Sequence, residues 1–400
     1  MKKIHLIFLL AITIILISQL DISGTNPSDE KYVPVPEPAL TGDFNIGVFR
    51  CPLWYEKTRP NAWEPIKRFP ERTPLLGYYN EADPEFVDWE IKFALENGIS
   101  FFVECWFRKI DNRGHSPVRD TLNHWLHNGF FHSRYRDMMQ FAILWENENR
   151  ISTGADGIDD LIDNLMPYWI ENYFSKPSYL KVDGKPFFII YGYQNFIDDM
   201  GGRENATVAV DKMKQTAKNA GFNGLFLVAE YHDPFHVDLS FLKDVGFDAI
   251  TSYHWPSFSG LMPTVPETQG QIVEFQEQCW PKLKEISDLP SITTISVGWD
   301  SEPWGFSYYK GQWTLTPDYF RKLCESAKRY NLENPDPVSN FIIIDNWNEY
   351  GEGHYIFPTR QYGFGHLTAI RNTFSVSKPN HIDILPEDIG LGPYIYKKND

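Results

Sequence analysis

The sequence predicts a (β/α)8 barrel, in which eight parallel strands form a closed ring surrounded by helices. Three observations favour this fold: the chain has 400 residues, apolar runs of strand length recur eight times, and helical segments separate these runs. A closed α/β barrel often uses this length as a single domain. The mean hydropathy of −0.38 and the 22% of charged residues indicate a globular chain with ample material for one large core.

The first 24 residues have the layout of a secretory signal peptide. Two lysines precede an apolar stretch from Ile4 to Leu20, and small and polar residues follow, with cleavage expected near Ser23 or Gly24. An uncleaved anchor is the alternative. No later segment is long and apolar enough to span a bilayer, so we expect an exported protein, periplasmic or extracellular, with no membrane insertion after signal removal. Residues 25–43 are rich in proline and are expected to be extended or disordered.

The barrel is expected to occupy residues 44–375. Its eight predicted strands are Phe44–Arg50, Ile99–Trp106, Met139–Trp145, Pro186–Tyr193, Leu225–His232, Phe247–Trp255, Ser291–Trp299 and Asn340–Trp347. The clearest helix follows Asp83, a residue suited to the N-cap, with Pro84 in the first turn and Gly98 after the last. Further helices are predicted at Asp159–Tyr173, Thr207–Ala220, Glu267–Glu285 and Pro317–Tyr330. Residues 376–400 are expected to form a C-terminal extension across the outside of the barrel.

The stretch DNWNEYGEG, Asp345–Gly353, carries the strongest functional signal. It places Glu349 and Glu352 three residues apart in a glycine-flanked loop directly after the eighth strand. Active sites of such barrels lie at the carboxyl ends of the strands. Two carboxylates this close repel each other, which suits a site where one must hold a proton and the other must not. We therefore predict that both are catalytic; the alternative is that they are salt-bridged or capping residues.

Other polar and aromatic residues at the strand ends are predicted to contact a substrate, together with Tyr79 before the first helix. The predicted contacts are Trp54, Tyr79, Glu104, Trp106, Trp145, Asn147, Glu148, Tyr191, Glu230, His232, Tyr253, His254, Trp299, Asp300, Asn346, Trp347 and Asn348. Aromatic rings stack on the apolar faces of sugars while carboxylates and amides bind hydroxyls, and paired carboxylates cleave glycosidic bonds. For Glu148, pairing with a nearby arginine such as Arg150 is the alternative.

Composition and motifs disfavour several other functions. A formal net charge of −16 and a pI of about 5.1 disfavour nucleic acids and anionic membranes as partners. The segment FRCPLW after the first strand lacks the His-x-His of a metallohydrolase barrel, and no GxSxG motif is present. We expect neither a metal nor a cofactor. The four cysteines, Cys51, Cys105, Cys279 and Cys324, lack metal-ligand spacing and are expected to be buried thiols.

Several segments resemble one known family, the WbsX-like family, which belongs with the glycoside hydrolase family 99-like proteins. The segments are Leu76–Phe107, WENEN (Trp145–Asn149), Tyr179–Tyr191, Gly298–Trp304 and Asn346–Pro358. They follow the order of the family, from about residue 45 to residue 372. The sequence departs from the usual pattern at Glu146, Ser301, Tyr350 and Phe357, all near the predicted pocket, so the sugar specificity is left open.

The resemblance implies a barrel glycosidase that retains anomeric configuration without forming a glycosyl-enzyme. In the family 99 endo-mannosidases, one glutamate removes the proton of the sugar 2-hydroxyl, which attacks to give a 1,2-anhydro sugar, and the other protonates the leaving oxygen. By position, Glu349 would be this base and Glu352 the acid/base. Two alternatives stay open, a glycosyltransferase of polysaccharide biosynthesis and a non-catalytic glycan-binding barrel. An export signal disfavours the transferase, whose nucleotide-sugar donor is cytosolic, while an intact glutamate pair disfavours the binder.

Overall fold

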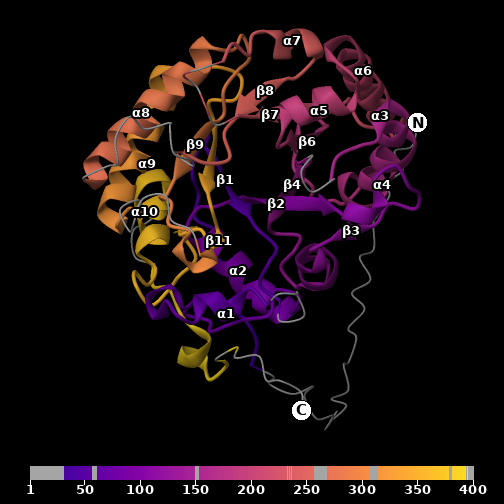
Figure 1. The fold of residues 1–400 in the computed structure, drawn as a ribbon. Coiled ribbons are helices and arrows are strands. Elements are labelled where there is room, and N and C mark those ends of the chain that lie inside the picture. Colours follow the sequence, from indigo (N-terminus) through magenta and orange to yellow (C-terminus); the bar gives the residue numbers. More distant parts are fainter. Residues whose placement is uncertain are drawn as a thin grey trace, which may run out of the picture.

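A computed structural model describes residues 31–55, 61–148, 153–231, 237–255, 268–305, 314–377 and 381–392, together with the single residues 233, 235 and 394. Among them, eight parallel strands form the barrel and confirm the predicted fold (Figure 1). These strands are β1 (Asn45–Arg50), β2 (Phe101–Arg108), β4 (Gln140–Glu146), β6 (Lys185–Ile190), β7 (Phe226–Glu230), β8 (Ala249–Thr251), β9 (Thr293–Ser296) and β10 (Phe341–Asp345).

Two contacts complete the ring of strands, the pairing of β1 with β10 and a bridge between β8 and β9. The paired strands follow the order β8-β7-β6-β4-β2-β1-β10-β9, so the first strand lies beside the last. Between β8 and β9 the gap is bridged by backbone hydrogen bonds on both sides of Ile250, whose N–H donates to the Pro290 carbonyl at 2.9 Å and whose carbonyl accepts from Ile292 at 2.9 Å. A closed ring leaves no strand edge free to pair with another chain.

Aromatic rings fill the end of the barrel opposite the predicted site. Phe101, Phe187 and Phe341, at the starts of three strands, have ring centroids 6.0–6.4 Å apart. Gly47 of β1 leaves room for one of these rings, because a Cβ at this position would lie 2.1 Å from the Phe101 side chain. The barrel interior at this end is therefore a packed core, as is typical of such barrels.

Helices surround the strands, as Figure 1 shows. The helices are α1 (Trp63–Ile66), α2 (Pro84–Glu96), α3 (Gly157–Asp160), α4 (Met166–Trp169), α5 (Tyr193–Asp199), α6 (Arg203–Asn219), α7 (Phe241–Val245), α8 (Gln269–Glu285), α9 (Pro317–Glu333) and α10 (Gly365–Phe374). The π-helical turns η6 (Leu161–Leu165) and η7 (Ile170–Phe174) extend α3 and α4 into one continuous helical segment. The five helices predicted from the sequence are present, and Asp83 caps α2 by accepting from the Glu85 N–H.

Short elements complete the loops. The short strands are β3 (Asp120–Thr121), β5 (Lys181–Val182), β11 (Asn348–Glu349) and β12 (His354–Tyr355). The remaining helical turns are η1 (Pro70–Arg72), η2 (Ile110–Asn112), η3 (Trp125–Gly129), η4 (Phe130–His132), η8 (Glu302–Trp304) and η9 (Pro386–Ile389). These short elements and the helices α1, α5, α7 and α10 were not predicted from the sequence.

Segments from both ends of the chain cover α2. The Tyr32 hydroxyl donates to Asp88 at 2.6 Å, and the Ala39 N–H donates to the Leu95 carbonyl. From the other end, Tyr394 accepts from the Trp89 indole at 2.7 Å. This cover explains why α2 is buried on nearly every side, including charged residues that a surface helix would expose.

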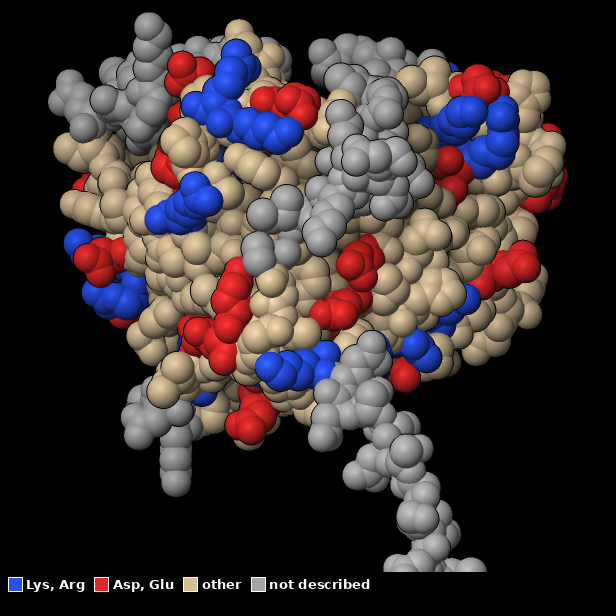
Figure 2. All heavy atoms as spheres, turned by 90° about the horizontal axis from the view of Figure 1, so that it is seen from below, with Lys and Arg blue, Asp and Glu red and all other residues tan. Residues whose placement is uncertain are grey.

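The surface and the cysteines agree with the sequence analysis where the structure describes them. Acidic and basic side chains are interspersed on the face shown in Figure 2, without a basic patch. All four cysteines are free and buried, as predicted. Within the described residues, no helix combines the length and the apolar character that crossing a bilayer requires. The predicted signal peptide lies outside the described residues.

Candidate active site

The two predicted catalytic glutamates lie on a β-hairpin that follows the eighth barrel strand. Strands β11 and β12 pair antiparallel, with Glu349 directly opposite His354. Glu352 lies in the turn between them. Glu349 is only 5% exposed, whereas 27% of the Glu352 side chain reaches solvent. The hairpin thus presents one buried and one accessible carboxyl group at the carboxyl end of the barrel.

The glycines on either side of Glu352 permit a close approach of the neighbouring loop. A Cβ at Gly351 would lie 2.0 Å from the Trp304 indole, and a Cβ at Gly353 would lie 2.7 Å from the backbone nitrogen of Asp300. Gly353 also has a φ of +78°, a conformation that side chains with a Cβ rarely adopt. The GEG motif is therefore required by the geometry of the turn that holds Glu352.

Arg72 and Asp300 fix the hairpin in place. The Arg72 guanidinium donates to the carbonyl oxygens of Tyr350 at 2.8 Å and Asp300 at 2.9 Å, and it pairs with the Asp300 carboxylate at 2.7 Å. The Asp300 N–H in turn donates to the Glu352 carbonyl at 2.7 Å. Asp300 was predicted to contact substrate; in the structure its carboxylate pairs with Arg72 and its backbone holds the turn that carries Glu352.

Burial and charge separate the two carboxyl groups. Burial, followed by the nearby Glu352, raises the pKa of Glu349 to about 8, although His354 and a hydrogen bond with the Cys51 thiol oppose the shift. The Oε2 atom of Glu349 is buried and has no hydrogen-bond partner among the described residues. At neutral pH, Glu349 therefore holds a proton mainly because its carboxylate would be poorly solvated.

A hydrogen-bonded network of two histidines extends from Glu352. The Asp345 carboxylate contacts Nδ1 of His254 with one oxygen and Nδ1 of His354 with the other. The His354 Nε2 atom lies 2.9 Å from Glu352 Oε2. Burial alone would lower the pKa of His354, but Asp345 and Glu352 outweigh it and raise this pKa to about 10. His354 is therefore an imidazolium that donates to Glu352.

Asp345, His254 and His354 are also close enough together to be considered as metal ligands. However, the Nδ1 atom of each histidine contacts an Asp345 oxygen directly, and Nε2 of His354 contacts Glu352. Donor and acceptor atoms in direct contact leave no room for an ion between them. Among the described residues, this set fits a proton-sharing network better than a metal site.

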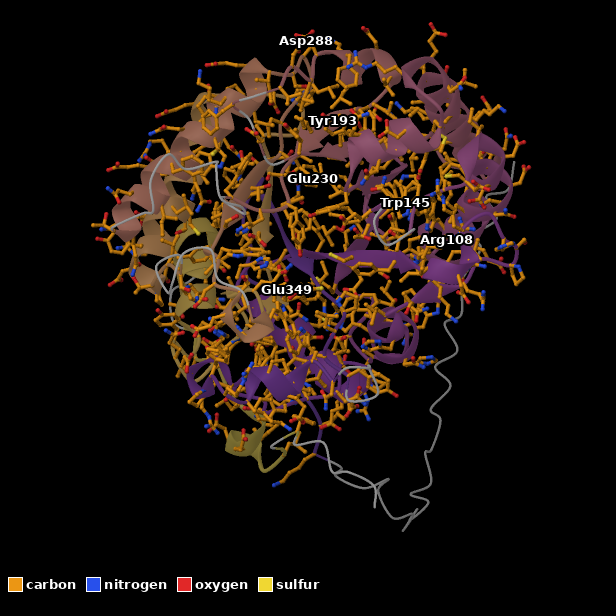
Figure 3. All side chains as sticks on the ribbon, viewed as in Figure 1. Arg108, Trp145, Tyr193, Glu230, Asp288 and Glu349 are labelled. Carbon is orange, nitrogen blue, oxygen red and sulfur yellow. The ribbon has the colours of Figure 1, made fainter. Side chains whose placement is uncertain are left out.

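Several predicted contact residues meet at this hairpin. The Asn346 amide donates to the Tyr253 hydroxyl at 2.8 Å, and the Tyr253 N–H donates to Glu230 at 2.9 Å. The Tyr191 ring packs edge-on against Tyr253. The Trp299 ring stacks on His354 with centroids 5.0 Å apart, and it also packs against His254. Figure 3 shows Glu230 and Glu349 toward the middle of the molecule, with Asp288 at its periphery.

Four other predicted contact residues point away from this site. In β2, the inward-facing Cys105 thiol lies 4.0 Å from the Tyr253 hydroxyl, so Glu104 and Trp106 on either side point outward. Trp106 donates to Tyr173 at 3.0 Å, Trp145 packs on Trp169, and Trp347 donates to Glu90 at 2.9 Å. These four side chains are therefore placed away from the hairpin. Glu104, Trp106 and Trp145 alternate with inward-facing residues of their strands, and Trp347, which follows β10, is buried against Glu90.

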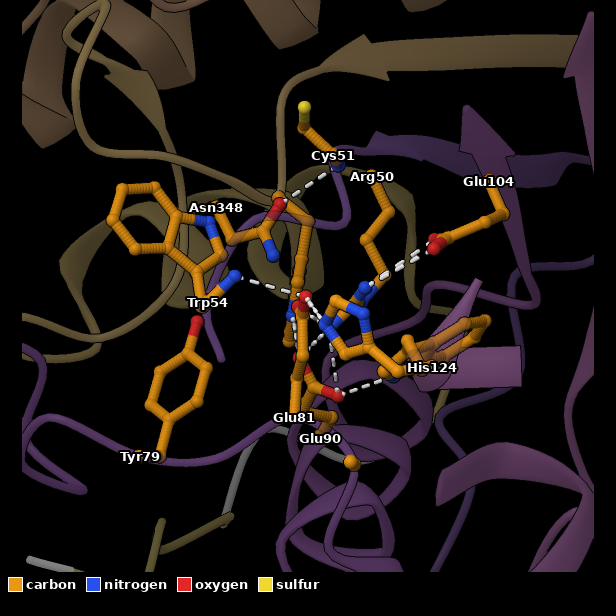
Figure 4. Close-up of polar contacts among 12 residues, drawn as sticks. Arg50, Cys51, Trp54, Tyr79, Glu81, Glu90, Glu104, His124 and Asn348 are labelled. Atoms are coloured by element: carbon orange, nitrogen blue, oxygen red, sulfur yellow. Dashed lines mark hydrogen bonds and ion pairs between the residues drawn. The ribbon is translucent and has the colours of Figure 1, made fainter. Parts of the chain in front are cut away.

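Glu104 belongs to a buried charge cluster on the outer side of the barrel strands, facing the helices (Figure 4). Fully buried Arg50 contacts Glu81 at 2.6 Å and both Glu90 and Glu104 at 3.3 Å, with its guanidinium 4.2 Å from the Trp125 ring. Burial raises the pKa of Glu104 well above its usual range and that of Glu90 to about 6. One arginine faces three carboxyl groups here, which explains why some of them retain protons.

The remaining predicted residues support the loops. Trp54 and Tyr79 are fully buried in an aromatic cluster with Tyr350, so their rings offer no face to a sugar in this structure. Asn147 exchanges two hydrogen bonds with Gly192, and the Asn348 side chain accepts from the Cys51 N–H. Glu148 is partly exposed at the end of β4. His232 lies outside the described residues.

Sequence reasoning missed Asp345, His354 and Cys51, which contact Glu349, Glu352 or the histidine network beside them. The position of His354, two residues after Glu352 in an extended segment, was the one signal present. Neither its pairing opposite Glu349 nor the distance to Asp345 could be read from spacing alone.

Comparisons with known proteins agree with the barrel fold. A glycoside hydrolase-like protein of known structure superposes with a TM-score of 0.60 at 16% identity, over 86% of this chain and 98% of the other. An endo-alpha-mannosidase of glycoside hydrolase family 99 from Bacteroides thetaiotaomicron gives 0.53 at 15% identity, over 80% and 88%. These identities show a shared fold. No curated protein matches the chain by sequence. A family model described as glycosyltransferase WbsX matches residues 67–370, most of the chain, and the protein therefore belongs to this WbsX family.

Proposed function

We propose that the protein is a glycoside hydrolase that cleaves glycosidic bonds in an oligo- or polysaccharide, with Glu349 and Glu352 as its catalytic pair. The observation that carries this proposal is the hairpin that presents one buried, protonated carboxyl group and one accessible carboxyl group bound to an imidazolium. Pairs of carboxyl groups with different protonation are the machinery of glycosidic bond cleavage. The partly exposed rings of Tyr191 and Tyr253 beside the pair suit a sugar.

The proposed reaction retains configuration through a 1,2-anhydro sugar. Glu349 removes the proton of the 2-hydroxyl, the 2-oxygen bonds to the anomeric carbon, and the bond to the leaving oxygen breaks as Glu352 donates its proton. In the second step, Glu352 takes a proton from water and the water oxygen bonds to the anomeric carbon. The bond between the anomeric carbon and the 2-oxygen breaks, and Glu349 returns its proton to the 2-oxygen. The cycle begins and ends with Glu349 ionised and Glu352 protonated, the state that the bound substrate selects.

The raised pKa of Glu349 is compatible with a role as base. A base with a pKa of about 8 takes a hydroxyl proton more readily than an ordinary carboxylate does. A sugar hydroxyl that donates to the unpartnered Oε2 atom stabilises the ionised form, and the proton displaced from Glu349 is then held by Glu352. The pair thus shares one proton, whose position the substrate selects.

The experiment that tests the proposal is incubation of the purified protein with a panel of plant, algal and microbial polysaccharides. Chromatography of the products should show release from at least one glycan, and product length separates endo from exo action. Glu352→Gln should reduce turnover of unactivated glycans by at least about a hundredfold. The matched control, Glu333→Gln, changes an exposed glutamate at the end of α9 and should leave turnover unchanged. Product formation that survives in both Glu349→Gln and Glu352→Gln would contradict the assignment.

The description of the family as a glycosyltransferase favours a second candidate, transfer from a sugar nucleotide. The same protein incubated with sugar nucleotides and an acceptor glycan should release no UDP or GDP. Release of either nucleotide would support the transferase and contradict the hydrolase. If glycans bind without product, and bind equally in Glu352→Gln, the protein is a binding module.

We also propose that the chain is exported, because its first 24 residues have the layout of a signal peptide. Sequencing the N-terminus of the protein recovered from the producing cell tests this. A new N-terminus near Ser23 or Gly24 is expected, whereas an intact Met1 would contradict cleavage.

A further inference from the structure

We propose that His354, oriented by Asp345, is a positioning residue that holds Glu352 in place and supplies the positive charge beside the catalytic pair. This inference rests on the proposed function of the pair. Neither His354 nor Asp345 would contact the substrate. They would act through a chain of hydrogen bonds from Asp345 to His354 and from His354 to Glu352.

The geometry leaves His354 little freedom. Its side chain is fully buried, as is that of Asp345. Asp345 ends barrel strand β10, whereas His354 begins β12, so two different elements fix the two ends of the hydrogen bond. The Trp299 ring, 5.0 Å away and nearly parallel, covers one side of the imidazole. Only one Glu352 oxygen, Oε2, is engaged by His354, which leaves the other free to approach a glycosidic oxygen.

The contacts of His254 indicate which of the two histidines carries the positive charge. His254 contacts the other oxygen of Asp345, and its ring lies 4.8 Å from that of His354. Two adjacent imidazolium ions would repel each other, and burial lowers the pKa of His254. Only His354 also has Glu352 as a partner, whereas Nε2 of His254 has no partner among the described residues. The positive charge therefore resides on His354, and His254 helps to hold Asp345.

The titratable groups around His354 come from every neighbouring segment. Asp345 at the end of β10, Glu349 opposite on β11 and Glu352 in the turn are acidic, while His254 and Tyr253 follow β8. Among them, the His354 charge opposes the rise in the pKa of Glu349. Removing this charge should therefore raise the pKa of Glu349 further and shift the shared proton toward that residue.

The first test needs no substrate. Nitrogen-15 NMR of the histidine side chains in the full protein should show one imidazole that stays doubly protonated from neutral pH to about pH 10, and this signal should be missing in His354→Gln. In Asp345→Asn, the imidazole should lose its proton at lower pH. The inference is overturned if every histidine in the wild-type protein is neutral by pH 8, whether or not any glycan is cleaved.

The second test uses the glycan cleaved by the wild-type protein. His354→Gln retains an amide donor toward Glu352 but removes the charge. We expect kcat to fall about a hundredfold with little change in KM, and the alkaline limb of the pH profile to move to higher pH. His354→Ala should lose more activity, because it also removes the donor. The control is His366→Gln, which alters a buried histidine of α10 bonded to the Leu315 carbonyl, and it should leave the pH profile unmoved.

The outcomes separate this inference from the proposed function. If the wild-type protein cleaves no glycan, the proposed function fails, and the NMR titration still decides the charge of His354. If glycan is cleaved and His354→Gln keeps the wild-type kcat and pH profile, the positioning role is wrong while the hydrolase stands. If kcat falls equally at every pH without a shift of the limb, His354 has a structural role only, and the inference fails.

Discussion

At the residue scale, the site depends on one carboxyl group that is costly to ionise. Glu349 is buried beside another acid, and its Oε2 atom has no partner among the described residues. Burial of this kind normally destabilises a protein, and its persistence beside a barrel mouth is typical of a functional site. The pKa of about 8 means that Glu349 carries a proton over most of the neutral range.

The pH dependence of activity follows from this shared proton. Cleavage requires one ionised and one protonated carboxyl group, so kcat/KM should decrease as pH rises through about 8, where the pair loses its last proton. The measurement is kcat/KM between pH 4 and pH 10 on the cleaved glycan. A plateau that continues to pH 10 would contradict the pairing of these two residues.

Substrates that differ in their leaving group can distinguish the proposed acid role of Glu352 from the proposed base role of Glu349. An aryl glycoside with a good leaving group needs little protonation, so it should partly restore the first step in Glu352→Gln but should not restore Glu349→Gln. Turnover of the two variants is compared on natural and activated substrates. If the activated substrate rescues Glu349→Gln instead, the roles of the two residues are reversed.

The burial of Glu349 also predicts that the stability of the folded protein decreases as this residue ionises. Because the folded state raises the pKa of Glu349 above its ordinary value of 4.5, the protonated residue contributes stability below about pH 4.5, and this is lost as pH rises through about 8. Glu349→Gln carries no charge, so its thermal stability relative to the wild type should increase from pH 6 to pH 9, on the order of a few kcal/mol. A constant difference in Tm over this range would contradict the buried-charge explanation.

At the element scale, the catalytic hairpin depends on the backbone around Glu352. Gly353→Ala should force a Cβ into the Asp300 backbone and displace the turn, with a loss of activity of at least about tenfold and about 1–3 kcal/mol of stability. Gly305→Ala is a matched control, because Gly305 also has a positive φ, +89°, but nothing lies within 4 Å of the position that its Cβ would take. Activity should fall only in the first variant, and an equal fall in both would show that strain alone is responsible.

The junction between β1 and α2 depends on Arg50. Arg50→Met leaves three buried carboxyl groups without their cation, and the free energy of unfolding should decrease by about 3–5 kcal/mol. Lys67→Met removes the cation of the exposed Lys67–Glu64 pair and should change stability by less than about 1 kcal/mol. Urea denaturation of both variants measures the difference. Similar stabilities would show that the Arg50 cluster contributes little.

At this scale the sequence predicted the positions of the main strands and helices but not the direction in which their side chains point. The eight barrel strands and five helices were predictable because apolar runs, caps and prolines are local signals, as with Asp83 and Pro84 at the start of α2. The sequence analysis did not predict correctly whether side chains at the strand ends point into the barrel or toward the helices. Trp106 and Trp145 were assigned to the pocket by residue type, whereas alternation along each strand turns them toward the helices.

At the scale of the whole molecule, α2 is held by segments from both ends of the chain. Removing residues 378–400 would take away the Asp383 contact with Asn97 and the Tyr394 contact with Trp89. We expect a lower Tm with kcat unchanged, because the catalytic hairpin lies on other elements. Thermal unfolding of the truncated and full-length proteins checks this, and an unchanged Tm would show that the extension adds no stability.

The global arrangement also limited what the sequence could reveal about the site. The pair Glu349 and Glu352 could be identified because both lie in one short motif. The contact of Asp345 with His254 joins the end of β10 to the segment after β8, so it depends on the closed ring. The same is true of Arg72, which reaches the turn from η1. Contacts of this kind follow from tertiary packing, which a single sequence without the fold does not specify.

The pairing of the first strand with the last has a consequence for biosynthesis. Asn45 of β1 pairs opposite Phe341 of β10. Strand β1 is synthesised long before β10, so it cannot form this pairing until β10 has also been made. Until then, β1 has one edge without its native partner, and such edges promote aggregation of nascent chains. Glu349 and Glu352 lie in the hairpin after β10, so the proposed catalytic pair cannot form until the chain has been synthesised past this strand.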